Sequence, residues 1–175
     1  MSTRYILTAF GQDRVGIVAD VTQIMYELGC NLEDSEMTRL SDEFAVIFLF
    51  SAPQADIEGK LSSACRRLEL DKGIAAFFRP LQGEPQPPQG SGILANIHVE
   101  GVDQCGIVYK VSRYLADNKV NIIRVHSTQN YSPQSGTAIY AVHLEVELPQ
   151  HMSLSELKKG LQHVADALHV DIQIN

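Results

Sequence analysis

The chain has 175 residues, 45% hydrophobic and 20% charged, which is the composition of an ordinary globular protein. Its 14 Lys and Arg against 21 Asp and Glu leave a net charge of −7, so it lacks the basic surface expected of a nucleic-acid-binding protein. Its three cysteines have no metal-ligand spacing, so we expect reduced thiols in a cytoplasmic protein, with neither a disulfide scaffold nor a metal or other cofactor.

The longest apolar run, residues 44–50, is far shorter than the ~20 residues needed to cross a bilayer. The amino terminus has too short an apolar stretch for a signal peptide, because charged residues follow at once. We therefore expect no contact with membranes.

The first part of the chain predicts the order strand, helix, strand, strand, helix, strand. Its first strand ends at Gly11, and an apolar stripe at helical spacing follows. Asp13 stands where the N-cap of that helix belongs, and Gly29 stands where the helix would end in the left-handed conformation. The predicted strands cover residues 4–10, 31–40, 44–51 and 74–79, and the predicted helices cover 15–28 and 57–68.

Residues 81–92 contain three prolines and three glycines and almost no apolar side chain, a composition typical of a linker. The same order of elements then repeats, with six extra residues around 131–136. The predicted domains are a first module at 1–80, the linker at 81–92 and a second module at 93–175. In the second module strands are predicted at 93–100, 121–129, 137–148 and 170–174, and helices at 107–115 and 154–168.

The two modules share one motif. Residues 11–32 align with residues 101–122 without a gap, which identifies a duplication. The pattern predicts an α+β fold with two antiparallel four-stranded sheets, each covered by two helices on one face. The aligned pairs are Gly11 and Gly101, Asp13 and Asp103, Gly16 and Gly106, and Asn31 and Asn121.

Several catalytic motifs are absent from the sequence. The Gly-x4-Gly spacing is followed by Ile-Val and not by the Lys and Ser or Thr of a phosphate-binding loop. No Gly-x-Ser-x-Gly elbow occurs, and the six histidines form no helical i, i+4 pair, so we expect them to be solvated or hydrogen-bonded rather than metal ligands. We predict that the chain is not an enzyme.

The best candidate site is the turn between the first strand and the first helix. Free N–H groups at a helix N-terminus bind carboxylates, and glycine at positions 11 and 16 lets a ligand approach the backbone. Asp13 and Asn31 are then available for an ammonium group. A purely structural interpretation stays open, in which Asp13 caps the helix, Gly16 permits close packing and Asn31 starts a strand.

The repeated unit resembles the ACT domain family, in the pattern Gly-x-Asp-x-x-Gly-Ile-Val and in the later Asn. The resemblance implies a ferredoxin-like fold, pairing of modules into a continuous sheet, and an amino acid bound at their interface. Gln104 in place of Arg14 and Lys119 in place of Gly29 make the second site differ from the first. The residues implied as effector-binding are Gly11, Asp13, Arg14, Val15, Gly16 and Asn31, with Gly101, Asp103, Cys105, Gly106 and Asn121.

Two ACT-like modules without a catalytic domain resemble the glycine cleavage system transcriptional repressor family. This implies a cytoplasmic regulator that senses glycine and acts on a DNA-binding activator protein without touching DNA. Unpaired sheet edges favour a homodimer. Two alternatives stay open, a structural protein-interaction module and an allosteric regulatory subunit of an amino-acid-metabolism enzyme.

Overall fold

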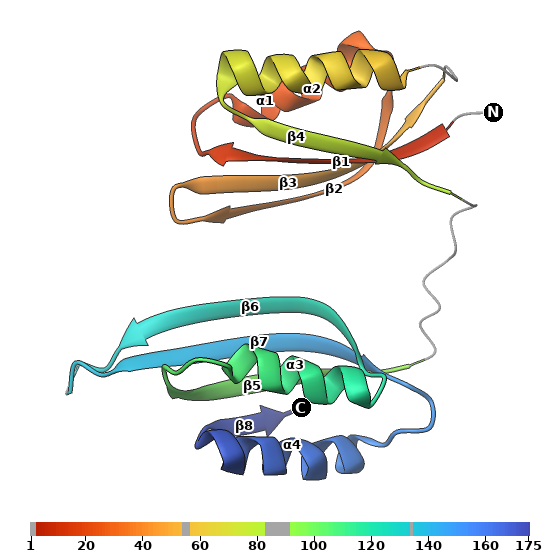
Figure 1. The fold of residues 1–175 in the computed structure, drawn as a ribbon. Helices are drawn as coiled ribbons and strands as arrows, with labels where there is room; N and C mark the ends of the chain where they lie inside the picture. The colour runs from red at the N-terminus through yellow and green to blue at the C-terminus, as the bar shows by residue number, and fades with distance from the viewer. Residues whose placement is uncertain (1–2, 54–56, 83–91, 134) are drawn as a thin grey trace. The chain divides into compact units, whose positions relative to one another are not determined.

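The computed structural model describes residues 3–53, 57–82, 92–133 and 135–175 (Figure 1). The chain divides into two compact units, Met1–Pro85 and Gln86–Asn175. Each unit has the predicted order β-α-β-β-α-β. The module boundaries proposed above stay a prediction, because residues 83–91 of the expected linker lie outside the described part of the chain.

The first unit is one antiparallel sheet with strand order β2-β3-β1-β4 and both helices on the same face (Figure 1). β1 is therefore a central strand and β2 an edge strand. Its elements are β1 (Thr3–Gln12), α1 (Ile17–Glu27), β2 (Asn31–Leu40), β3 (Glu43–Ala52), α2 (Glu58–Lys72) and β4 (Ala75–Pro80).

The second unit repeats this topology with strand order β6-β7-β5-β8. The predicted fold class, two ferredoxin-like modules in tandem, is confirmed. Its elements are β5 (Ile93–Val102), α3 (Ile107–Asp117), β6 (Asn121–Tyr131), β7 (Ala138–Leu148), α4 (Leu154–Leu168) and β8 (Asp171–Ile174).

The core of each unit lies between the sheet and the helices. Alternate residues of β3 point toward the helices and are buried, and the intervening ones face the other side of the sheet. Burial of each large side chain contributes roughly 1.5–3 kcal/mol, so the alternation fixes which face the helices cover. The buried residues of β3 are Phe44, Val46, Phe48, Phe50 and Ala52, and those of β7 are Val142, Leu144, Val146 and Leu148.

The edge strand β2 is exposed along its whole length. The helices do not cover the opposite face of either sheet (Figure 1). Among the described residues, every helix is too short or too polar to span a membrane.

Candidate functional site

The strand-to-helix turn, defined as residues 13–16 and 103–106, is built alike in both units. β1 continues to Gln12, and the Asp13 N–H then donates to the Asp42 carbonyl of the β2–β3 turn at 2.7 Å. That bond holds Asp13 beside the hairpin, and the helix begins only after Gly16, whose φ is 87°. The prediction that Asp13 is the N-cap was therefore wrong. Gly16 occupies that position and makes no side-chain capping hydrogen bond.

Each turn aspartate contacts the end of the edge strand. An oxygen of Asp13 lies 3.4 Å from Arg39 Nη1, and Gln129 Nε2 donates to Asp103 Oδ2 at 2.6 Å. Arg39 and Gln129 occupy equivalent positions of β2 and β6. The Arg39 side chain is 66% exposed, so this ion pair lies at the surface, where a ligand can reach it.

Arg14 points away from that pair. Its Nη2 contacts Asp20 on α1 at 2.5 Å, and Lys72 Nζ approaches the same carboxylate at 3.6 Å. The hydrogen bond from Arg14, reinforced by the charge of Lys72, lowers the pKa of Asp20. In the second unit Gln104 instead donates to the Leu168 carbonyl.

The paired glycines have two different structural roles. A Cβ on Gly11 would lie 3.0 Å from the Gly73 carbonyl oxygen, and one on Gly101 would lie 2.6 Å from Val170 Cγ1. These two glycines make room for the chain between the second helix and the last strand. Gly16 and Gly106, with φ of 87° and 96°, are needed for the left-handed conformation that begins each helix.

Asn31 is not brought next to the turn of its own unit. It begins β2 opposite Ser51, which in turn faces Arg4 near the start of β1. Asp13 follows the other end of β1, nine positions after Arg4, and a strand of that length spans about 30 Å. α1 carries the chain back along the sheet, so the aspartate and the asparagine of one unit cannot share a small ligand. The same register places Asn121 opposite Glu147, at the far end from Asp103.

The remaining predicted residues lie on the surface of the turn. Val15 is 100% exposed, and its counterpart Cys105 is an exposed free thiol. An apolar side chain left entirely in water is compatible with contact to another surface, but by itself it identifies no ligand.

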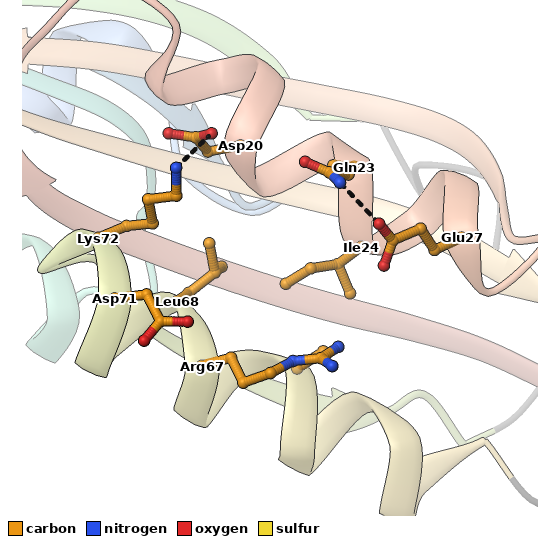
Figure 2. A pocket seen from close by; sticks show the side chains of 9 residues that line it. Asp20, Gln23, Ile24, Glu27, Arg67, Leu68, Asp71 and Lys72 are labelled. Atoms are coloured by element: carbon orange, nitrogen blue, oxygen red, sulfur yellow. Dashed lines mark hydrogen bonds and ion pairs between the residues drawn. The ribbon is translucent and has the colours of Figure 1, made fainter.

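The sequence did not predict a pocket of about 220 Å³ between α1 and α2 (Figure 2). The Asp20–Lys72 pair closes one end of it, and Ile24 and Leu68 approach from the two helices (Figure 2). Arg67 and Asp71 also line it, so acidic and basic groups both face the space. Charged residues next to the apolar stripe of each helix are the sequence feature from which this pocket could have been predicted.

Both modules match a family model described as ACT domain, over residues 3–79 and residues 89–171. The glycine cleavage system transcriptional repressor of Escherichia coli (strain K12) is 23% identical over 171 residues, covering 97% of this chain and 88% of the relative. A UPF0237 protein of Methanopyrus kandleri is 36% identical over 73 residues, which is 41% of this chain and 81% of that protein.

A crystal structure of an unknown protein from Galdieria sulphuraria superposes with a TM-score of 0.81 at 26% sequence identity. The match covers 100% of this chain and 98% of the other. A solved structure therefore also contains two such modules in one chain.

Proposed function

The chain belongs to the ACT domain family, and on this basis we propose that it is a non-catalytic, cytoplasmic regulator that binds a small amino acid. We further propose that this amino acid is glycine and that occupancy is relayed to a DNA-binding activator protein. The proposal is supported by the similarity to the E. coli repressor over nearly the whole chain, at the level of a related regulatory ACT-domain protein.

The observation that carries the proposed site is the separation of Asn31 from the turn of its own unit. Asp13 and Arg39 lie at one end of the sheet and Asn31 lies at the other. A site that uses both ends therefore needs two modules. We place it between the first units of two copies of the chain.

An antiparallel pairing of two β2 strands makes such a site. β2 is an edge strand, exposed along its length, so its unpaired N–H and C=O groups are free to add a neighbouring strand. In an antiparallel pair the start of each strand lies beside the end of the other. The start of β2 in one copy, with Asn31, then lies beside the end of β2 in the second copy, which carries Arg39 and lies next to Asp13, and the two-fold symmetry generates two equal sites.

The charges at this place suit a zwitterion. Arg39 and the free N–H groups that begin α1 favour the ligand carboxylate, while Asp13 and the amide oxygen of Asn31 favour the ammonium. The exposed Asp13–Arg39 pair contributes no more than about 1 kcal/mol, so the ligand can separate the two groups at small cost. The second unit has Gln129 in place of Arg39, so we expect its turn to bind amino acids more weakly.

Regulation requires that the ligand bind one arrangement of the modules more tightly than another, since equal affinity would change nothing. A ligand held between two β2 strands stabilises the paired arrangement by its own binding energy. Glycine would then favour dimers, and the activator protein would distinguish the paired from the unpaired form.

A thermal-shift screen of the twenty amino acids tests the proposal. A ligand at 100 times its Kd should stabilise the protein by ~2.7 kcal/mol. We expect a response to glycine that Asp13→Asn abolishes and that Asp103→Asn, the matched change in the second unit, leaves largely intact. A flat response to all twenty amino acids would contradict the sensor proposal.

Mixing two inactive variants tests whether the site is shared between copies. Asp13→Asn and Asn31→Ala should each remove binding, because each damages both sites of the dimer. In a mixed dimer one site loses both groups and the other keeps both, so a 1:1 mixture should recover about a quarter of the binding sites. No recovery would overturn the arrangement between two copies.

A second candidate function is a protein-interaction module without a ligand. It is favoured by exposed apolar side chains on the open face of the first sheet, where Phe10 and Phe77 stack with centroids 6.1 Å apart and Ile47 on β3 is half-exposed. This candidate predicts no amino-acid response, together with a partner whose binding is lost on Phe77→Ser.

A further inference from the structure

Three histidines form a row across the second sheet. His126 on β6 pairs with His143 on β7, and His143 pairs with His98 on β5. Because directly opposite residues project to the same side, all three rings stand on the face that the helices leave open. They line a pocket of about 490 Å³ together with polar residues of the neighbouring strands. Arg124 and Glu145 also line it, and because they form an ion pair at 3.4 Å their charges offset each other.

Two of the rings are already in contact. His98 Nδ1 and His143 Nδ1 are 3.2 Å apart, and the ring centroids are 4.3 Å apart. On its other side, His98 Nε2 lies 3.2 Å from Glu100 Oε2. A carboxylate can only accept, so Nε2 of a neutral His98 carries the proton and its Nδ1 has a free lone pair. His143 Nδ1–H then donates to that lone pair.

We propose that His98 and His143, joined by His126, bind a divalent transition-metal ion of the Zn²⁺ class. With metal–nitrogen bonds of about 2.0–2.1 Å and tetrahedral angles, two ligand nitrogens lie about 3.3 Å apart, which the two Nδ1 atoms already match. The ion displaces the shared proton, which moves from Nδ1 to Nε2 of the His143 ring. The metal lies to one side of the line between the two Nδ1 atoms, because their 3.2 Å separation is too short for two bonds of about 2.0–2.1 Å in a straight line, so both rings turn to direct their lone pairs at it.

Glu100 has the role of an orienting residue. Ligating histidines usually donate their second ring N–H to a carboxylate, which fixes the tautomer and the ring direction. The Glu100–His98 contact provides this arrangement without contacting the ion itself. The imidazole donor set favours Zn²⁺, Cu²⁺ or Ni²⁺ over Mg²⁺ or Ca²⁺, which prefer oxygen.

His126 completes the site by a side-chain rotation. Among the described residues no three His, Cys, Asp or Glu side chains converge as they stand. His126 is exposed on an edge strand, and exposed side chains change rotamer on the picosecond to nanosecond scale. Its ring starts one strand away from His143, so it can become a third ligand, with water in the fourth position.

The first unit shows that the fold does not require these histidines. The equivalent row consists of Glu36, Ile47 and Thr8, in the same register on β2, β3 and β1. A row of three imidazoles that is confined to one of two duplicated sheets indicates a property of the second unit alone. The proposed metal site is separate from the amino-acid site and does not depend on it.

Titration of the tag-free, chelator-treated chain with Zn²⁺ alone, followed by calorimetry, tests the proposal. We expect one ion per chain with micromolar affinity. His98→Gln and His143→Gln should each weaken binding by more than about 100-fold, and Glu100→Gln should weaken it by about 10–100-fold. His163→Gln and Cys105→Ser are the matched controls and should leave the affinity unchanged.

Two outcomes would overturn the proposal. One is the absence of saturable binding below millimolar Zn²⁺, and the other is unchanged binding in both His98→Gln and His143→Gln. Because the three histidines are accessible on the sheet surface, these variants should fold, and circular dichroism checks this. Co²⁺ provides a second readout, since a tetrahedral site with nitrogen ligands gives visible absorption that the same variants should remove.

Discussion

Replacing Gly101 by alanine should destabilise the second unit by roughly 1 kcal/mol, within a range of about 0–2.5 kcal/mol. The new Cβ would lie 2.6 Å from Val170 Cγ1 and 3.3 Å from Val170 Cα, so backbone as well as side chain must move. Overpacking of this kind costs typically ~1–3 kcal/mol, and alanine recovers about 0.5–1 kcal/mol because it restricts the unfolded chain more than glycine does. The difference is the expected loss of stability.

Hydrogen exchange at increasing denaturant concentration measures this loss, because it reports on β5 and β7 separately from β1 and β3. Amide hydrogens of β5 and β7 should exchange faster in the variant, while the exchange rates in β1 and β3 should be unchanged. Gly59→Ala is the control, since nothing lies within 4 Å of a Cβ there. Unchanged protection of β5 would refute the packing role of Gly101.

Four further substitutions test other parts of the structure by denaturant unfolding. Gly29→Ala should lower the free energy of unfolding by about 1 kcal/mol, because alanine is strained at the φ of 66° although the space around it is open. An unchanged denaturation midpoint would contradict this. Ser153→Ala should cost about 1 kcal/mol by removing the capping box of α4. The hydrogen bonds from Ser153 lower the pKa of Glu156, so the ionised Glu156 carboxylate stabilises the fold at neutral pH. This stabilisation is lost as the pH falls through the lowered pKa. Glu156→Gln should therefore make the free energy of unfolding depend less on pH in that acid range. Gly160→Ala should destabilise the α3–α4 contact by no more than about 2 kcal/mol, because the Tyr114 ring must move away from the new methyl group while alanine is about 1 kcal/mol better than glycine inside a helix.

The fold was predictable because the same order of strand and helix patterns occurs twice in the sequence. Alternation in residues 44–51 placed β3, and the left-handed position of Gly29 was anticipated from the end of the helical stripe. The second unit keeps that backbone conformation at Lys119, with φ of 58°, although glycine is absent there. Local sequence therefore located the elements, and the repeat confirmed their order.

The site was harder to predict because strand pairing brings together residues that are far apart in the sequence. Asp13 resembled a cap in the sequence, but a hydrogen bond to the β2–β3 turn holds it beside Arg39. The distance of Asn31 from its own turn follows from the path of α1, which no local pattern reveals. The contact between His98 and His143 also arises from the pairing of β5 with β7, across 45 residues of chain.

Calorimetric titration of the full chain with glycine is the most direct test of an amino-acid site shared between two first units. We expect saturable binding of one glycine per first unit, abolished by Asp13→Asn and by Asn31→Ala and preserved in Asn121→Ala. Binding that survives both first-unit substitutions, or no binding of any amino acid, would contradict it.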